Sequence, residues 1–546
     1  MQLFTVFILS LFLTIALVPL FKRMAFKMNI VDMPDARKVH VLPMPKTGGI
    51  SMAIGAFIPF ILWIPKDDFV SAVLLGSMIL VISGLVDDIR ILTSLQKLVP
   101  QVAAALIIIL WGGVRIHHIG LVGHDGMLLS GIASIFFTLF VIIGVTNAIN
   151  LSDGLDGLAG GISMLSFVMI TFLAYQSDHL SVALISIAVV GAIAGFLRFN
   201  THPAVVFMGD AGSQLLGFLV ITFALVLTQT HTPYSRVLSL TLIGFPILDT
   251  LMVMVERIVK GQSPFKADKN HFHHRLLRLG FSHAEAVLMI YVIQACFLSC
   301  AFIFRYYAGW VHLLLFMGFS IIVLFLFFAA YKTGWKLHKD AGVDSVTRQW
   351  IKLIKDRKIF IRVCFGGARY GLPILLTLQC LIPAKIPFSI SIAASGLIGL
   401  LCCVHFFLKQ YQGIVFRFVA CLMIPFIVYF SETTPAVWFS KELYHLNFAA
   451  YLVMVIFVLL TMRLTQRTNG FKLTPMDILV FIVILVFPNL PTTHLQTFGA
   501  GTALAEALVL FFSFDVLIGE FRKETGFMSG ACIAVLSVLV FRGFFG

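Results

Sequence analysis

Residues 130–175 read SGIASIFFTLFVIIGVTNAINLSDGLDGLAGGISMLSFVMITFLAY, and this stretch decides the fold because two apolar runs flank one polar turn. Each run reaches the roughly 17 to 25 residues that a helix needs to cross a bilayer. The turn carries Asn147, Asn150, Asp153 and Asp156. Ionisable groups near a bilayer are costly unless they serve one another, a metal or a ligand. The stretch therefore predicts membrane helices with a polar site at one end.

The same pattern of apolar runs extends along the whole chain. Of its 546 residues, 60% are hydrophobic and 12% are charged, and the mean hydropathy is +1.01. This composition excludes a soluble globular domain, which is about half apolar and a quarter charged. We predict an all-α, polytopic integral membrane protein with about 11 transmembrane helices in a first block and about seven in a second. The expected spans of the first block are 2–20, 48–65, 69–86, 98–112, 130–149, 157–175, 180–197, 212–230, 237–256, 284–304 and 310–331. Those of the second block are 370–383, 387–408, 414–431, 446–462, 476–489, 500–518 and 526–544.

These blocks suggest three parts of the chain. Residues 1–331 form the expected catalytic membrane domain, 332–369 a basic cytoplasmic linker and 370–546 a C-terminal membrane domain of unknown role. Residues 2–20 lack a basic start and a small-residue cleavage site, which indicates a retained span and not a removed signal. All eight cysteines lie in the second half without a C-x-x-C pair, which favours buried structural roles over disulfides or a metal site.

Basic residues predict the orientation of the chain. With the N-terminus outside, the inner loops of the first block and the linker hold 25 Lys and Arg, and the outer loops hold only Lys66, Arg115, Arg236 and Arg305. Short cytoplasmic loops carry such an excess. The formal net charge of +14 is explained by this bias, so we expect no nucleic-acid partner. The assignment places every acidic motif on the cytoplasmic side.

One acidic motif lies at the end of an expected span, and another lies at the beginning of one. Asp87 and Asp88 end one span, and adjacent helical residues point about 100° apart, so they can share a cavity only at a helix end. A solvated helix end paired with Arg90 is an equal alternative. Asp210 opens another span after Phe207-Met208-Gly209. It suits a metal ligand, although it could instead cap the helix.

The polar turn indicates a metal site more specifically than these two motifs do. Asn147, Asn150, Asp153 and Asp156 are spaced by three residues, which stacks side chains on one helical face. Amide and carboxylate oxygens suit Mg²⁺, which shares its coordination shell with substrate phosphates. Asp153 could merely cap the next helix, but that would not explain the other three residues.

A histidine-rich loop adds the expected positive charge. His271, His273 and His274 lie beside Arg275, and Arg and protonated His form charge-assisted hydrogen bonds with phosphoryl oxygens. Zinc is an alternative, but the nearby cysteines of a common structural site are absent. An N-terminal loop contributes further basic residues, which alone could be no more than topological charge: Arg37, Lys38, His40 and Lys46.

Five motifs, in this order, resemble those of the polyprenyl-phosphate N-acetylhexosamine-1-phosphate transferases. The likeness is greatest to the bacterial UDP-GlcNAc:undecaprenyl-phosphate GlcNAc-1-phosphate transferases. It covers about residues 1–330, and nothing recognised covers 332–546. The motifs are Val31–His40, Gly84–Asp88, Asn147–Gly157, Phe207–Gly212 and Ala267–Gly280. The family pattern often has a third Asp after the pair, whereas this chain has Arg90 and Ile91.

The resemblance implies a reaction, a cofactor and a location. It implies Mg²⁺-dependent transfer of sugar-1-phosphate from a UDP-N-acetylhexosamine to undecaprenyl phosphate with release of UMP, with Mn²⁺ as an alternative ion. The expected place is the bacterial inner membrane with the active site facing the cytoplasm. Membrane lipids are further partners and a homodimer is left open.

Residue roles follow from motif position. The implied catalytic residues are Asp87, Asp88, Asp153, Asp156 and His271. The implied metal ligands are Asp210, Asn150 and Asp153. The implied substrate-binding residues are Lys38, His40, Lys46, Asn147, Asn150, His273, His274 and Arg275.

A phosphate monoester is already largely ionised at neutral pH, so we expect direct attack on the UDP-sugar and no aspartyl intermediate. An ion-coupled transporter is the rival interpretation, because broken helices with intramembrane carboxylates also build ion sites. Against it, the motifs gather on one side and no inverted repeat is visible. The second block could also be a separate binding or docking module.

Overall fold

A computed structural model gives the structure, and it divides the chain into two compact units. The first is Met1–Lys339 and the second comprises most of the remainder. The described residues are 2–28, 30–33, 43–90, 92–120, 127–229, 232–263, 271–336, 358–407, 412–464, 506–507, 509–510, 513–514, 517 and 525–545.

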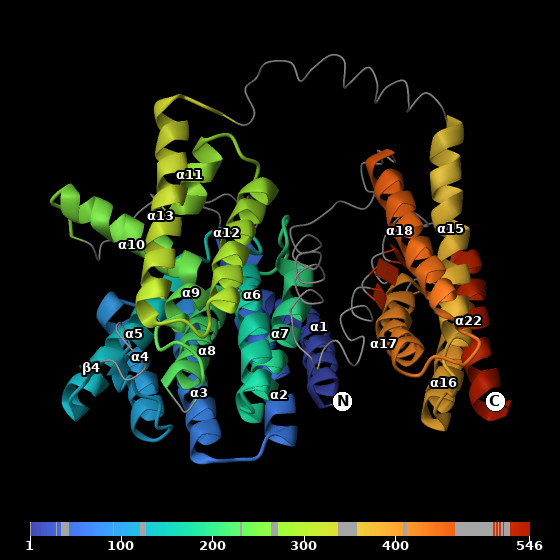
Figure 1. Cartoon of the computed structure of the whole chain (residues 1–546), viewed down its shortest axis with the longest axis horizontal. Helices are drawn as coiled ribbons and strands as arrows, with labels where there is room; N and C mark the ends of the chain where they lie inside the picture. The colour runs from blue at the N-terminus through green and yellow to red at the C-terminus, as the bar shows by residue number, and fades with distance from the viewer. Residues whose placement is uncertain are drawn as a thin grey trace. The chain divides into compact units, whose positions relative to one another are not determined.

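Helices build the first unit (Figure 1). They are α1 (Gln2–Met28), α2 (Gly48–Trp63), α3 (Asp68–Ile89), α4 (Ser94–Leu110), α5 (Gly131–Leu151), α6 (Leu158–Gln176), α7 (Leu180–Asn200), α8 (Gly209–Gln229), α9 (Leu238–Leu242), α10 (Gly244–Val259), α11 (Phe272–Arg278), α12 (His283–Ile303) and α13 (Gly309–Lys332). Among the described residues, 8 helices are long and apolar enough to cross a membrane. The strands are two-residue antiparallel pairs, β1 (Val31–Asp32) with β2 (Met44–Pro45) and β3 (His118–Ile119) with β4 (Met127–Leu128). The predicted all-α membrane fold is confirmed.

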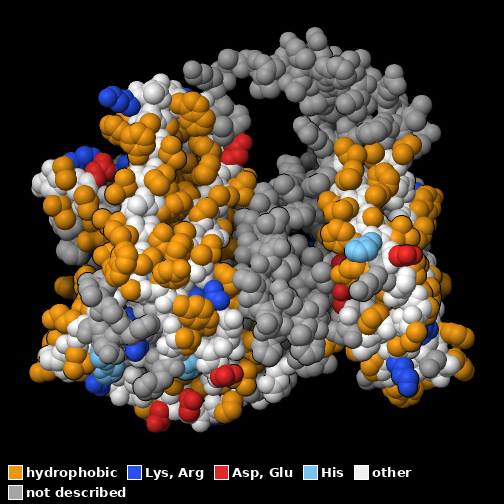
Figure 2. Space-filling view, viewed as in Figure 1, with side chains coloured by type: hydrophobic (Ala, Val, Ile, Leu, Met, Phe, Trp, Pro, Cys, Tyr) orange, Lys and Arg blue, Asp and Glu red, His pale blue; other side chains and the backbone are white. Residues whose placement is uncertain are grey.

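The outer surface of this unit suits lipid. Apolar side chains cover α13 (Figure 2), where Leu314, Ile321 and Phe325 are each more than half exposed. Monomeric soluble proteins rarely expose contiguous apolar surface of this kind. Because lipid tails are as apolar as these side chains, such a surface is stable in a bilayer.

Helix α8 forms the centre of the first unit and is buried along its whole apolar span. Glycines allow its neighbours to approach closely. A Cβ on Gly49 of α2 would lie 2.3 Å from the backbone nitrogen of Gly212 on α8, and one on Gly217 of α8 would lie 2.7 Å from the Cα of Thr146 on α5. These backbone contacts fix α8, and therefore the residues at its start, relative to α2 and α5.

The expected span 237–256 is not continuous. It is broken into α9 and α10 at Ile243. A Cβ on Gly244 would lie 2.4 Å from the Cγ of Phe297, so only glycine fits at the break. The buried amide of Gln294 meets the interrupted backbone there. Its Nε2 donates to Leu242 O at 2.9 Å, and its Oε1 accepts from Phe245 N at 3.0 Å.

The second unit is also helical, with α15 (Lys358–Leu381), α16 (Phe388–Phe407), α17 (Gln412–Thr433), α18 (Lys441–Leu464) and α22 (Thr525–Phe545). Helix α15 begins inside the predicted linker, ahead of the expected span 370–383. The reason is that apolarity decides which residues can lie in lipid, whereas a helix needs only its own backbone hydrogen bonds. The expected span 476–489 and most of 500–518 lie outside the described residues. The functional division into three parts stays a prediction.

Candidate active site

The ends of three helices bring together carboxylates that are far apart in sequence. Asp87 lies in the last turn of α3 and Asp210 in the first turn of α8. Lys97, near the start of α4, joins them. Its Nζ lies 2.5 Å from Asp87 Oδ2 and 2.9 Å from Asp210 Oδ2. Two helices that each present an acid to one ammonium group can also present them to another cation.

Asp88 caps the N-terminus of α8. Its Oδ1 accepts from the backbone N–H of Asp210 at 3.2 Å, and its Oδ2 accepts from that of Ala211 at 3.4 Å. Gly209 has a φ of 72°, and a Cβ there would lie 2.3 Å from Asp88 Oδ2. The capping carboxylate of α8 is therefore that of Asp88, which leaves the carboxylate of Asp210 directed at Lys97.

Lys46 provides a second positive charge at this site. Its Nζ lies 3.3 Å from Asp32 Oδ1 and 3.9 Å from Asp88 Oδ1. Attraction between opposite charges at such distances is appreciable in a partly desolvated site. The other basic residues predicted from the N-terminal loop, Lys38 and His40, lie outside the described residues.

The polar turn is only partly helical. Because α5 ends at Leu151, the predicted face of four stacked side chains is limited to Asn147 and Asn150. Asn150 Oδ1 accepts from the Ser213 hydroxyl of α8 at 2.5 Å. Asn147 Nδ2 donates to the side-chain oxygen of Gln101 on α4 at 3.1 Å. The two amides therefore tie α5 to the helices that carry Asp210 and Lys97.

Asp153 follows the end of α5 and does not cap the next helix, because α6 starts after Gly157, whose φ is 81°. Burial, together with the negative charges of Asp210 and Asp156 and against the attraction of Lys46, raises the pKa of the Asp153 carboxyl to about 7. Asp153 therefore belongs to the same electrostatic group as Asp210.

We call Asp87, Asp88, Asp153 and Asp210 the acidic cluster. Lys97 and Lys46 contact it, but Lys46 lies closer to Asp32 than to Asp88, so the two lysines leave a net negative charge when the carboxylates are ionised. A divalent cation would neutralise this remainder, and carboxylate oxygens are the ligands that Mg²⁺ prefers.

Asp156 faces a neighbouring group and not the acidic cluster. Its Oδ2 lies 2.8 Å from His202 Nδ1 and accepts from Ala204 N at 3.1 Å. The His202 ring stacks on that of His283 with centroids 4.1 Å apart. These three side chains offer ligand atoms within 4.8 Å of one another. The predicted catalytic residue thus lies in a polar subsite beside the cluster.

Asp249 of α10 holds the histidine-rich loop in place. Its Oδ2 lies 3.0 Å from His271 Nδ1, and its Oδ1 accepts from Phe272 N at 2.7 Å. This fixes α11 so that His273 packs on the polar turn, where a Cβ on Gly154 would lie 2.3 Å from His273 Nε2. The structure therefore brings the histidine-rich loop to the predicted site.

The charge of this loop differs from the expectation. Burial, followed by the nearby His274, lowers the pKa of His273 to about 4, so this imidazole is neutral at pH 7. Arg275 pairs with Glu256 of α10. The predicted substrate contacts of Arg275 and His273 stay predictions.

Sequence reasoning missed Lys97 and Asp249. Lys97 is one of the basic residues in the expected inner loops, and its partner Asp210 is 113 residues away in the sequence. Asp249 lies in an apolar run and 22 residues before His271. A charged residue inside an expected span was the available signal for Asp249.

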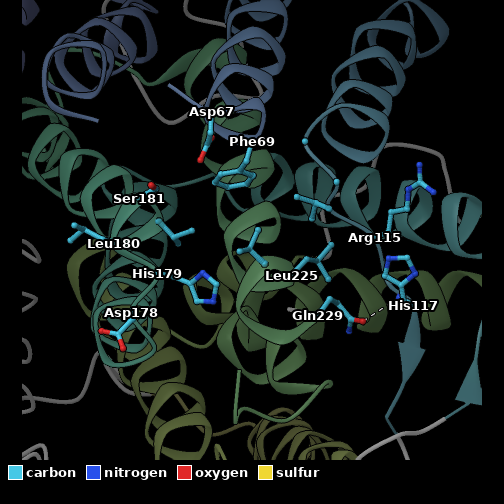
Figure 3. A pocket seen from close by; sticks show the side chains of 15 residues that line it. Asp67, Phe69, Arg115, His117, Asp178, His179, Leu180, Ser181, Leu225 and Gln229 are labelled. Carbon is cyan, nitrogen blue, oxygen red and sulfur yellow. Dashed lines mark hydrogen bonds between the residues drawn. The ribbon is translucent and has the colours of Figure 1, made fainter. Parts of the chain in front are cut away.

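A cavity of about 600 Å³ opens elsewhere in the first unit (Figure 3). Its lining includes Asp67, which precedes α3, Asp178 and His179, which precede α7, and Gln229, which ends α8. Asp87 lies at the other end of α3. Since α3 has 22 residues that rise 1.5 Å each, its ends lie roughly 33 Å apart. The cavity is therefore separate from the acidic cluster.

Comparison with known proteins identifies the family. The model of glycosyl transferase family 4 matches residues 70–228, which run from α3 to α8. A probable undecaprenyl-phosphate N-acetylglucosaminyl 1-phosphate transferase of Bacillus subtilis (strain 168) is 33% identical over 330 residues, which are 60% of this chain and 91% of that protein.

Two further relatives agree. The undecaprenyl-phosphate alpha-N-acetylglucosaminyl 1-phosphate transferase of Escherichia coli (strain K12) is 33% identical over 339 residues, covering 60% of this chain and 91% of the relative. The decaprenyl-phosphate N-acetylglucosaminephosphotransferase of Mycolicibacterium smegmatis is 34% identical over 302 residues, covering 49% of this chain and 74% of the relative. This chain is a multi-pass membrane transferase that belongs to the family of polyprenyl-phosphate N-acetylglucosaminyl 1-phosphate transferases.

Proposed function

We propose that the protein transfers N-acetylhexosamine-1-phosphate from a UDP-sugar to undecaprenyl phosphate, giving undecaprenyl-diphospho-sugar and UMP. The observation that carries the proposal is the convergence of the acidic cluster, Lys97 and the histidine-rich loop at one end of the membrane helices. Two relatives are named for undecaprenyl phosphate, which supports this acceptor. N-acetylglucosamine is the favoured sugar for the same reason.

Both substrates are anionic, so the site must overcome their repulsion. Mg²⁺, or Mn²⁺ in its place, would be held by Asp210 with Asn150 and Asp153. The net negative charge of the acidic cluster and its oxygen atoms fit a divalent ion. When bound, the ion would neutralise the diphosphate and the charge that develops on the departing UMP.

The protein's own side chains contribute the remaining steps of the reaction. A lipid phosphate oxygen attacks the phosphorus that carries the sugar, the bond from this phosphorus to the bridging oxygen breaks, and UMP leaves with the electron pair. Lys97 and Lys46 attract the two phosphate groups to one place, and positioning of this kind supplies much of the rate. Asp87 or Asp88 accepts a last proton if the lipid phosphate still holds one. The neutral His273 donates a hydrogen bond to a phosphoryl oxygen.

The proposed setting is the cytoplasmic face of a bacterial inner membrane. The excess of basic residues in the expected inner loops supports this orientation. The reaction would be the first membrane step in the synthesis of a cell-envelope glycan of the O-antigen, teichoic-acid or capsule type, because it creates the lipid-linked diphosphate on which further sugars can be added.

The test is an assay of the purified full-length protein with undecaprenyl phosphate and a panel of UDP-N-acetylhexosamines, with and without EDTA. We expect release of UMP that requires lipid phosphate, occurs with at least one UDP-sugar and stops when the divalent ion is removed. No UMP from any sugar, in protein shown to be folded, would contradict the proposal and would favour the transporter alternative.

A further inference from the structure

The second unit buries a carboxylate in its apolar core. Glu506 is 6% exposed and adjoins the core residues Ala507 and Leu510. Its Oε1 accepts from Asn447 Nδ2 of α18 at 3.2 Å, and its Oε2 accepts from Gln379 Nε2 of α15 at 3.4 Å. Three segments of this unit therefore meet at one acidic group within the membrane domain.

Two further buried oxygens in the same place have no hydrogen-bond partner. They are Gln379 Oε1 and the hydroxyl of Tyr451, in side chains that are 0% and 3% exposed. Tyr451 lies one turn after Asn447 on α18, so both face the same side, and its hydroxyl lies near the Gln379 and Glu506 side chains without reaching hydrogen-bond geometry with either. We call Gln379, Asn447, Tyr451 and Glu506 the Glu506 cluster. A buried polar atom without a partner is costly, so these oxygens indicate a missing ligand.

The charge of the cluster has no basic partner among the described residues. In the described part of the chain, no Lys, Arg or His forms an ion pair with Glu506. Arg542 of α22 donates instead to the carbonyl oxygens of Cys380, Leu381 and Pro383. Among the described residues, the other ionisable groups that act on Glu506 are Tyr451 of α18 and Glu432 of α17, and Glu432 adds repulsion.

An isolated ionised carboxylate in an apolar core is strongly unfavourable, and in membrane domains such groups typically mark ion or proton sites. One monovalent cation would neutralise the single carboxylate of the Glu506 cluster. We propose that the Glu506 cluster is a binding site for a monovalent cation, Na⁺ or a proton, inside the second membrane unit. The proposal is independent of the sugar-phosphate transfer, because none of its residues belongs to the acidic cluster.

The test measures thermal unfolding of the purified full-length protein in NaCl and in choline chloride at equal ionic strength, each at several pH values from 6 to 9. The variant is Glu506→Gln, which keeps the shape of the side chain and removes its charge. The matched control is Glu442→Gln, which changes an exposed carboxylate on α18. Sugar-phosphate transfer is assayed on all three proteins to show that the first unit is intact.

A ligand that binds only the folded protein raises its Tm. If Na⁺ is bound, NaCl raises the Tm of the native protein and of Glu442→Gln by about 3 °C relative to choline and does not raise that of Glu506→Gln. If a proton is bound, the salts do not differ, and the native Tm falls as the pH rises because a charge is created in the core. The Tm of Glu506→Gln would not fall with rising pH in this way. Identical salt and pH responses in native protein and Glu506→Gln would overturn the proposal.

Discussion

Lys97 is the residue that links the two acidic helix ends, and it makes a sharp prediction at the residue scale. Lys97→Met keeps much of the chain length but removes the charge that Asp87 and Asp210 share. We expect the rate of UMP release to fall by about a hundredfold, as for loss of other preorganised charge at a reaction centre. The control is Lys66→Met, in an exposed loop between α2 and α3, which should leave turnover unchanged. Equal turnover in both variants would show that Lys97 is only an ion-pair partner.

At the residue scale, the sequence motifs contain most residues of the candidate site, and what the motifs could not predict has a physical cause. Asp87, Asp88, Asn150, Asp153 and Asp210 could be found because oxygen ligands at helix ends are unusual in an apolar chain. The geometry of these residues could not be predicted from the sequence, since it depends on which helices pack together.

The charge and the position of the histidines could not be predicted from the sequence either. The neutral charge of His273 follows from its burial against the polar turn, and the position of His271 follows from Asp249 on another helix. Both depend on tertiary contacts, whereas the sequence records only that three histidines lie close together.

At the element scale, the close contact of α2 with α8 predicts a sensitive glycine. A Cβ on Gly49 would lie 2.3 Å from Gly212 N and 2.6 Å from its Cα, and neither backbone atom can move without moving the helix. Gly49→Ala should therefore destabilise the fold by roughly 1 to 3 kcal/mol. It should also reduce turnover, because α8 carries Asp210.

The matched control is Gly144→Ala on α5, where a Cβ meets nothing within 4 Å. Alanine favours helix over glycine, so its Tm should be equal to or above that of the native protein. Thermal unfolding in detergent checks both variants. A Gly49→Ala protein with native Tm and native turnover would show that the α2–α8 contact is not tight.

Hydropathy predicted the helices of the first unit but not their interruptions. The break between α9 and α10 depends on Gln294, a polar residue on α12 that satisfies the backbone at Leu242 and Phe245. The early start of α15 was missed because a helix can continue beyond the apolar residues that lie in lipid. Both features are set by hydrogen bonds, which an average of apolarity does not report.

At the scale of the whole molecule, the orientation of the first unit can be tested by labelling. In a chain whose eight cysteines are replaced by alanine, one cysteine is introduced at Met127 or at Gln262, both exposed. The charge bias predicts that an impermeant thiol reagent added to intact cells labels Met127→Cys and not Gln262→Cys. The reverse pattern would place the acidic cluster outside the cell.

The second unit should be dispensable for the chemistry. The alignment with the Bacillus subtilis relative covers 91% of that protein but 60% of this chain, so the relative is too short to hold a comparable second unit. A protein ending after Trp335 should therefore retain measurable UMP release if it inserts and folds, as judged by a single peak in size-exclusion chromatography. A folded but inactive truncated protein would show that the second unit completes the site.

The central claim is that the acidic cluster performs the transfer, and Asp210 tests it most directly. Asp210→Asn keeps the shape and removes one charge, and the cap of α8 is preserved because Asp88 provides it. Asp178→Asn is the control, since Asp178 lines the cavity at the other ends of the helices and its φ of 59° is one that Asn tolerates.

The measurement is the initial rate of UMP release against Mg²⁺ concentration for the native protein and both variants, each with its Tm. We predict that Asp210→Asn keeps the native Tm but loses about a hundredfold in rate, while Asp178→Asn matches the native protein in both. Near-native rate and Mg²⁺ dependence in Asp210→Asn would contradict the account and place the metal elsewhere.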